Sequence, residues 1–263
     1  MSCIATGAHW ANRTLHNVGV SGDGDTASIG LGNFLHMVRR NVPIVYIVEN
    51  NGCYGLTKGQ FSATADTGSL KKGGKLANQM PPVDICALAI EMGCNFVARS
   101  FSGDTNQVRN LLMAAMAHEG TAVLDIISPC VTFNNHEGST KSVTYARQHE
   151  DPLHEIDFIP HFAPITVEYE EGETIVVDMH DGSKVTLKKL HEGHDPRNKD
   201  QALQLLHEVQ RTQHFYTGLL YHHTAANSLA EQQGLVDEPL ATLPTERIRP
   251  PRAAFDEIMA SYV

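Results

Sequence analysis

The chain has 263 residues, enough to bury a sizeable core as one large domain or as one domain with extensions. Its 41% hydrophobic and 19% charged residues are typical of a soluble globular protein, and its formal charge of −10 disfavours nucleic-acid binding, which needs a basic surface. No apolar run approaches the roughly 20 residues of a membrane helix. Because residues 1–7 also lack the charged and apolar regions of a signal peptide, we expect a cytoplasmic protein with no nucleic-acid or membrane partner.

Short β-branched runs alternate with helical stretches over the first half of the chain. Val18–Val20 predicts a strand that leads into a glycine-rich turn, and Pro43–Val48 is a continuous apolar run, typical of a strand buried on both faces. The helix predicted between them carries its apolar residues on or near one face, namely Ile29, Phe34, Leu35 and Val38.

The same alternation continues to residue 130. The predicted elements are a helix at Ile85–Met92 with Asp84 as N-cap and Gly93 as its stop, a strand at Phe96–Ala98, a helix at Thr105–His118 that ends before Gly120, and a strand at Ala122–Ile127. This order predicts a parallel α/β sheet flanked by helices, in which ligands bind at the carboxyl ends of the strands. We assign residues 1–160 to this α/β domain.

The character of the sequence changes after Cys130. Residues 134–160 are polar and irregular. Three alternating runs then predict an antiparallel meander, at Ile165–Tyr169, Thr174–Met179 and Val185–Leu190. Helices are predicted at 199–220 and 251–262. We expect residues 161–263 to form an extension of meander and helices that packs on a partner subunit.

Two polar loops follow neighbouring strands of the predicted sheet. Residues 22–25, Gly-Asp-Gly-Asp, follow the first strand, and Asn51 follows the second, 28 residues after Asp23. That interval holds one helix and one return strand, so both loops should meet at one edge of the sheet. A carboxylate, an amide oxygen and a backbone carbonyl suit the octahedral oxygen shell of Mg²⁺. Gly22 and Gly24 let the backbone approach a phosphate at the helix N-terminus.

This constellation resembles a known family. A Gly-Asp-Gly followed by a spacer and an Asn-Asn pair is the signature of thiamine-diphosphate enzymes. The longer similarity is to the beta subunits of 2-oxoacid:ferredoxin oxidoreductases, in segments 21–26 (SGDGDT), 39–42 (RRNV), 50–60 (NNGCYGLTKGQ) and 128–133 (SPCVTF). It runs from Ala5 to about Pro160 and is closest to the branch that acts on 2-oxoglutarate. The resemblance implies the thiamine-diphosphate-binding fold.

The resemblance also implies roles for individual residues. Asp23, Asn51 and the carbonyl of Cys53 would bind Mg²⁺. The residues expected to touch thiamine diphosphate are Gly22, Gly24, Asp25, Gly55 and Leu56. Lys58, with Leu56 beside it, would bind the substrate, because a cation can pair with the distal carboxylate of 2-oxoglutarate, which pyruvate lacks.

The implied reaction is the oxidative decarboxylation of 2-oxoglutarate with coenzyme A to succinyl-CoA and CO₂, with electrons passed to ferredoxin. In this family the glutamate that activates the cofactor lies on the partner alpha subunit. We therefore assign no catalytic residue in this chain and expect the active site at a subunit interface. The alternatives left open are a pyruvate or branched-chain 2-oxoacid:ferredoxin oxidoreductase beta subunit and, from another class, a truncated non-catalytic assembly or regulatory subunit.

Cys130 matches a family ligand to a 4Fe–4S cluster. The family supplies the other three thiolates in a C-x-x-C pair and a later Gly-Ile-Gly-Cys, and this chain has neither. Met1 falls inside the family's pattern, so we expect an N-terminally truncated chain that holds no cluster by itself. The odd number of cysteines, with no C-x-x-C pair, also argues against a disulfide framework.

Other ligand sites fit the pattern less well. A calcium loop that began at Asp23 would need a glutamate where Phe34 stands. A Rossmann site would need a third glycine after Gly22 and Gly24. The pair His191 and His194 has no third ligand, so we interpret it as part of a solvated loop.

Overall fold

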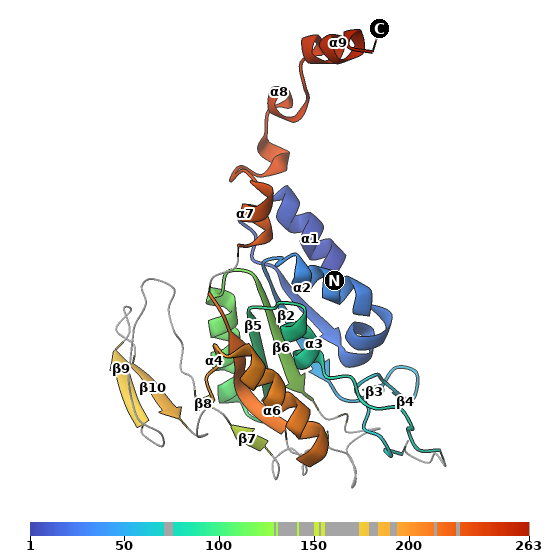
Figure 1. Cartoon of the computed structure of the whole chain (residues 1–263), viewed down its shortest axis with the longest axis vertical. Coiled ribbons are helices and arrows are strands. Elements are labelled where there is room, and N and C mark those ends of the chain that lie inside the picture. Colours follow the sequence, from blue (N-terminus) through green and yellow to red (C-terminus); the bar gives the residue numbers. More distant parts are fainter. Residues whose placement is uncertain are drawn as a thin grey trace.

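The computed structural model describes residues 1–70, 76–128, 130, 141, 150–152, 154–155, 174–178, 184–189, 194–212, 215–224 and 227–262. Within these residues the centre of the molecule is a six-stranded sheet with helices on both faces (Figure 1). Its strands, in spatial order, are β1 (Val18–Gly22), β2 (Ile44–Asn50), β6 (Thr121–Ile127), β5 (Phe96–Phe101), β11 (Phe215–His222) and β7 (Glu150–Pro152). The predicted α/β class with a parallel sheet is confirmed for β1, β2, β6 and β5.

The helices divide between the two faces of the sheet. They are α1 (Ser2–Ala11), a π-helix at Asp25–Ile29, α2 (Leu31–Arg39), α3 (Ile85–Glu91), α4 (Thr105–Ala117) and α6 (Lys199–Thr212). One apolar core joins α1, α2, α3 and α6 to one face of the sheet. A second core joins α4 to the opposite face. Alternate residues of the central strands enter each core, so Tyr46 belongs to the first and Val45 to the second.

The predicted N-cap of α3 and the glycines predicted to end α3 and α4 are confirmed. The Asp84 carboxylate accepts a hydrogen bond from the backbone N–H of Ala87 at the start of α3. Gly93 and Gly120, which follow α3 and α4, have φ values of 91° and 123°, a conformation that suits glycine.

Two predictions for the helices are wrong. Ile29 is 77% exposed, because the chain forms a separate π-helix before Gly30 and only then begins α2, whose buried residues are Phe34, Met37 and Val38. The helix predicted at 199–220 ends at Thr212, and residues 215–222 form strand β11. β11 lies antiparallel to β5 and therefore closes that side of the parallel strands.

The remaining strands form two small sheets in the described part of the chain. β3 (Cys53–Tyr54) and β4 (Gln60–Phe61) pair as a short hairpin. β9 (Thr174–Asp178) and β10 (Lys184–Lys189) pair antiparallel, which confirms part of the predicted meander. The third strand beside β10 is β8 (His154–Glu155), from the segment predicted to be irregular, while Ile165–Tyr169 lies outside the described residues.

The end of the chain extends away from the sheet (Figure 1). α7 (Leu229–Gln233) still contributes Leu229 to the first core, and the segment beyond it contains a 3-10 helix at Leu240–Thr242, α8 (Thr245–Ile248) and α9 (Arg252–Ala260), of which α9 was predicted. The proposed division at residue 160 stays a prediction. However, α6 and β11, which follow that boundary, contribute Leu206 and Leu220 to the core of the main sheet. Among the described helices, none is both long and apolar enough to cross a membrane.

Candidate functional site

Asp23 lies at the carboxyl end of β1 and is almost completely buried, with 1% of its surface exposed. Its Oδ2 accepts hydrogen bonds from the hydroxyls of Ser62 and Thr64. In the described part of the chain no salt bridge to Asp23 is present. A buried carboxylate that has hydroxyl partners and no cation leaves its negative charge uncompensated.

Asn51 meets Asp23 at the same edge of the sheet, as the two loops were predicted to do. β1 and β2 are adjacent and parallel, with Gly22 opposite Glu49. The backbone N–H of Asn51 faces Oδ1 of Asp23, with 3.5 Å between the nitrogen and the oxygen. The amide oxygen of Asn51 accepts a hydrogen bond from the backbone N–H of Cys53 at 3.0 Å, which orients this amide in the loop.

Cys53 presents a neutral thiol in this loop. Burial is the main cause that raises the pKa of the Cys53 thiol to about 12, and the nearby Cys130 and Asp23 add to it. The Cys130 side chain also hydrogen bonds with Cys53, so the predicted cluster ligand lies directly against the predicted metal loop. Because the Cys53 thiol stays protonated at neutral pH, the backbone carbonyl is the group that this residue can offer to a hard metal ion.

Gly24 is the glycine of the Gly-Asp-Gly turn whose space is most restricted. A Cβ atom at this position would collide with the ring of Tyr54, whose hydroxyl donates a hydrogen bond to the Gly24 carbonyl at 3.0 Å. Tyr54 therefore ties the metal loop to the turn before the π-helix. At Gly22 the nearest atom to an added Cβ is Oδ2 of Asp25, at 3.8 Å, so this glycine leaves open space.

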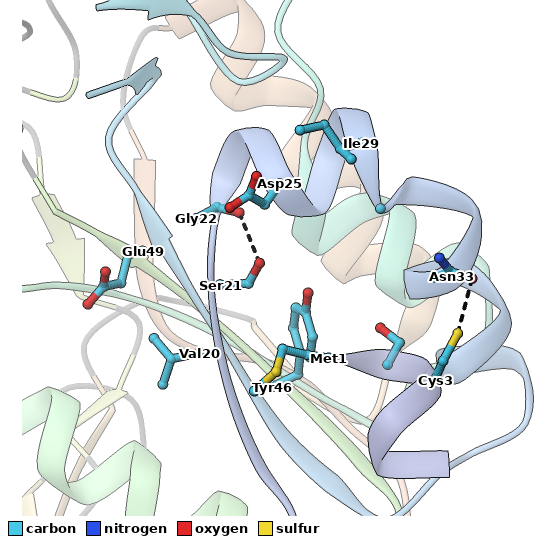
Figure 2. A pocket seen from close by; sticks show the side chains of 12 residues that line it. Met1, Cys3, Val20, Ser21, Gly22, Asp25, Ile29, Asn33, Tyr46 and Glu49 are labelled. Carbon is cyan, nitrogen blue, oxygen red and sulfur yellow. Dashed lines mark hydrogen bonds between the residues drawn. The ribbon is translucent and has the colours of Figure 1, made fainter. Parts of the chain in front are cut away.

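A pocket of about 550 Å³ opens beside the turn. Figure 2 shows Ser21, Gly22 and Asp25 at the end of β1, Tyr46 and Glu49 from β2, and Met1 and Cys3 at the start of the chain. Of the residues predicted to touch the cofactor, Gly22 and Asp25 line this pocket. Gly55, Leu56 and Lys58 lie instead on the exposed turn between β3 and β4, where Leu56 is 99% exposed and Lys58 has a φ of 72°.

Sequence reasoning missed the hydroxyls that hold Asp23. Ser62 and Thr64 come just after β4 and belong to no motif that we used. Asn50 was visible as the first asparagine of the Asn-Asn pair, and its position as the last residue of a buried strand could have indicated an inward side chain. Its amide Nδ2 donates a hydrogen bond to Oδ1 of Asp125 at 2.9 Å.

The prediction that His191 and His194 lie in a solvated loop is wrong for His194 and untested for His191. His194 is buried, and its Nε2 lies 3.1 Å from the carbonyl oxygen of Leu220. His191 lies outside the described residues. Among the described residues no group of three or more His, Cys, Asp or Glu side chains could hold a metal ion, so the oxygen donors around Asp23 form the strongest candidate.

The residues around Asp23 fit a divalent cation held beside a diphosphate. The Asp23 carboxylate, the adjacent Asn51 amide oxygen and the backbone carbonyl of Cys53 are hard oxygen donors, which Mg²⁺ prefers. The turn at Gly24 precedes a helical segment, whose first backbone N–H groups favour negative charge. The metal-ligand and cofactor assignments themselves stay proposals.

Comparisons with known proteins agree with this geometry. Residues 2–126 match the family described as thiamine pyrophosphate enzyme, C-terminal TPP binding domain. The chain is 37% identical over 170 residues to the beta subunit of 2-oxoacid:ferredoxin oxidoreductase 1 from Aeropyrum pernix, which covers 65% of this chain and 51% of that protein. It is 34% identical over 190 residues to the corresponding beta subunit from Saccharolobus solfataricus, over 72% of this chain and 58% of that protein.

Two further similarities involve proteins named for 2-oxoglutarate. The 2-oxoglutarate oxidoreductase subunit KorB of Mycobacterium tuberculosis is 35% identical over 157 residues, 57% of this chain and 42% of that protein. A structure of 2-oxoglutarate:ferredoxin oxidoreductase from Magnetococcus marinus, with 2-oxoglutarate, coenzyme A and succinyl-CoA bound, superposes with a TM-score of 0.69 at 27% identity. The alignment covers 94% of this chain and 70% of that one.

The chain spans about half the length of the curated relatives that it matches, 51% and 53% in two of them. The family match over residues 2–126 includes the strands β1, β2 and β5, nearly all of β6, the Gly-Asp-Gly turn and the Asn-Asn loop. The chain therefore carries a thiamine pyrophosphate enzyme C-terminal domain and belongs to the family of the 2-oxoacid:ferredoxin oxidoreductase beta subunits.

Proposed function

We propose that this chain is the beta subunit of a 2-oxoglutarate:ferredoxin oxidoreductase, which holds thiamine diphosphate through Mg²⁺ and works together with an alpha subunit. The observation that carries the proposal is the buried carboxylate of Asp23 beside Asn51 at the carboxyl edge of the sheet, which forms no salt bridge with a basic side chain in the described part of the chain. The reaction is the conversion of 2-oxoglutarate and coenzyme A to succinyl-CoA and CO₂, with the electrons passed to ferredoxin.

Each loop of the site has a separate task in this proposal. Asp23, the amide oxygen of Asn51 and the carbonyl of Cys53 would hold Mg²⁺. The backbone at Gly24 and Asp25 would bind the diphosphate. When bound, thiamine diphosphate supplies the electron sink for decarboxylation of a 2-oxoacid.

The exposed turn between β3 and β4 supports the choice of 2-oxoglutarate. Lys58 on this turn would pair with the distal carboxylate of the substrate and orient it, with Leu56 beside it. Pyruvate has no distal carboxylate, so it lacks the group that this lysine is proposed to bind. The name 2-oxoglutarate in two of the similar proteins supports the same choice.

Cys130 stays a proposed ligand to a 4Fe–4S cluster that would carry electrons towards ferredoxin. Its thiol lies against Cys53, so a cluster there would be next to the metal loop. The three other thiolates that the resemblance implies, in a C-x-x-C pair and a later Gly-Ile-Gly-Cys, are not among residues 1–263. In this proposal the alpha subunit completes the active site.

The first test measures binding alone. Isothermal calorimetry on the full chain should detect thiamine diphosphate binding that requires Mg²⁺, and Asp23→Ala should abolish it. Asp256→Ala is the control, because it removes an exposed carboxylate on α9, outside the proposed site. Failure of the wild-type chain to bind would contradict the cofactor assignment.

The second test measures activity with the partner subunit. Reduction of a one-electron dye is compared for 2-oxoglutarate and pyruvate, with coenzyme A, Mg²⁺ and thiamine diphosphate present. Lys58→Ala should lower kcat/KM for 2-oxoglutarate about 10- to 100-fold, the value of a charge-assisted hydrogen bond, and leave pyruvate turnover unchanged. Lys199→Ala, on the surface of α6, serves as the control.

The outcomes separate the alternatives. Faster turnover of pyruvate or of a branched-chain oxoacid would assign the chain to that version of the complex. No turnover of any oxoacid, with thiamine diphosphate bound and the partner present, would favour a non-catalytic assembly or regulatory role.

A further inference from the structure

A chain of buried hydrogen bonds runs from Asp23 across the sheet. The Thr64 hydroxyl lies within hydrogen-bonding distance of Oδ2 of Asp23 and, at 2.9 Å, of Oδ1 of Asn50. Asn50 is the last residue of β2, and its Nδ2 donates to Oδ1 of Asp125 on the adjacent strand β6. All four side chains are buried.

This row of hydrogen bonds ends at a cluster of ion pairs that joins β6, β5 and the start of α3. Nε of Arg99 donates to Oδ2 of Asp125 at 2.8 Å, and its Nη2 donates to Oδ1 of Asp84 at 3.0 Å. Burial works against the positive charge of Arg99, but Asp84, Cys86 and Asp125 outweigh it and raise the pKa of the guanidinium well above its ordinary value. Arg99 is therefore a permanent charge fixed in the core.

The numbers of donors and acceptors on these side chains fix which atom donates in each hydrogen bond of the row. Because the Asn50 Nδ2 is committed to Asp125, its oxygen must face Thr64. The Thr64 hydroxyl has one proton and faces two pure acceptors, the Asn50 oxygen and the Asp23 carboxylate, and it also lies 3.2 Å from the hydroxyl of Ser62, which can donate or accept. The orientation of Asn50, fixed from the far side by Asp125, thus decides where the Thr64 hydroxyl lies against Asp23.

The charges of the same group also point to a cation. Asp23, Asp84 and Asp125 are three carboxylates. Among the described residues Arg99, which pairs with Asp84 and Asp125, is the one guanidinium that forms a salt bridge with any of them, so the four groups carry a net charge of −2 when all are ionised. A divalent ion on Asp23 would bring the group to neutrality. Buried ion pairs can frequently be replaced by apolar residues without loss of stability, so stability alone does not explain the Arg99–Asp125 pair.

We propose that the Arg99–Asp125 ion pair is a positioning device for the Asp23 carboxylate, acting through Asn50 and Thr64. With Oδ2 of Asp23 held by hydroxyls, Oδ1 is left to face the metal beside Asn51. Arg99 and Asp125 are positioning residues in this account, and the inference rests on the proposed role of Asp23 as a Mg²⁺ ligand. Groups that orient a metal ligand typically change metal affinity 10- to 100-fold when they are removed.

The test titrates Mg²⁺ into the full chain at saturating thiamine diphosphate and follows binding by calorimetry. Thr64→Val removes the hydroxyl at constant shape and should raise the half-saturating Mg²⁺ concentration about 10-fold. Thr64→Ser keeps the hydroxyl and should stay within about 3-fold of the wild type. Asp125→Asn changes a side chain that is two hydrogen bonds further from the proposed metal site than Thr64. It should also raise the half-saturating Mg²⁺ concentration about 10-fold.

Thr121→Val is the matched control. Thr121 is buried at the opposite end of β6, and its hydroxyl donates to the carbonyl of Val42 at 2.7 Å. This variant loses a buried hydrogen bond as Thr64→Val does, so thermal unfolding should register both, while Mg²⁺ affinity should change only in Thr64→Val. If Asp125→Asn does not fold, the comparison of Thr64→Val with Thr64→Ser alone tests the positioning role.

The possible results distinguish this inference from the proposed function. A wild-type chain that binds no thiamine diphosphate with Mg²⁺ overturns both. If binding occurs and depends on Asp23, but Thr64→Val binds Mg²⁺ like the wild type, only the positioning role is overturned. The same conclusion follows if Thr121→Val weakens Mg²⁺ binding as much as Thr64→Val does, because the effect would then be one of general stability.

Discussion

His118, at the end of α4, belongs to a cluster of three rings away from the metal loop. Its ring centroid lies 5.5 Å from those of Phe96 and His222. Burial, with a smaller contribution from His222, lowers the pKa of His118 from its ordinary 6.5 to about 4. Burial also lowers the pKa of His222. Both imidazoles are therefore held in the neutral form by the folded protein.

This shift predicts acid sensitivity. Below pH 6.5 the unfolded chain binds a proton that folded His118 does not take up until about pH 4, so the free energy of unfolding falls as the pH drops between these values. Above pH 6.5 the contribution of His118 is fully present. We expect the free energy of unfolding to fall on acidification from pH 7.5 to 4.5 in both proteins. The fall should be about 2 kcal/mol smaller in His118→Phe than in the wild type, measured by urea denaturation. His36→Phe, at an exposed position of α2, should lose as much as the wild type, and an equal loss in all three proteins would contradict the assignment.

Sequence alone could indicate Asp23 and Asn51, because both follow strands directly and their spacing places them at one edge of the sheet. The same reasoning could not find Thr64, Asn50, Asp125 and Arg99 as a connected group. They lie on separate segments, and the residues that hydrogen bond to one another are between 14 and 75 positions apart along the chain. Their contacts arise only when β2, β6 and β5 lie side by side, and a single sequence does not specify that order.

At the scale of elements, the parallel strands and the helices between them follow from local patterns, but β11 does not. Residues 215–222 follow α6 closely and contain Leu219 and Leu220, which are compatible with a helix as well as with a strand. Their strand form is determined by the unpaired edge of β5, to which β11 hydrogen bonds. Tertiary pairing thus overrides a weak local preference here.

If β11 completes the core, shortening its buried side chain should be costly. Leu220→Ala is expected to lower the free energy of unfolding by about 2 to 5 kcal/mol, because the residue is fully buried between α6 and the sheet. Leu240→Ala, at a position that is half exposed, should change it by less than about 0.5 kcal/mol. Urea denaturation compares the two, and equal effects would contradict the placement of β11 in the core.

At the scale of the whole molecule, the segment from residue 239 onward stands apart from the rest. The 3-10 helix at Leu240–Thr242, α8 and α9 contain no buried residue. The apolar side chains of α9 and the residues after it recur at helical spacing and are at least half exposed, namely Phe255, Ile258, Met259 and Tyr262. Such a stripe is typical of a segment that packs on another surface, in line with the predicted subunit-packing arm.

Removing this arm should leave the body intact. A chain that ends at Glu238 is expected to unfold within about 2 °C of the full chain, since the deletion takes away no buried contact. A chain that ends at Thr212 lacks β11 and should lose its cooperative unfolding transition. Differential scanning calorimetry compares the two truncations, and a large loss for the shorter deletion would show that the arm belongs to the folded body.

The late position of β11 also has a consequence for how the protein is made. While the ribosome synthesises the chain, β1, β2, β5 and β6 emerge first and can pair, but the outer edge of β5 has to wait for nearly a hundred further residues. During that interval the nascent sheet presents unpaired backbone groups that can join another chain. Cells that overproduce this protein should therefore accumulate it in inclusion bodies unless slower translation or a chaperone protects the edge until β11 arrives.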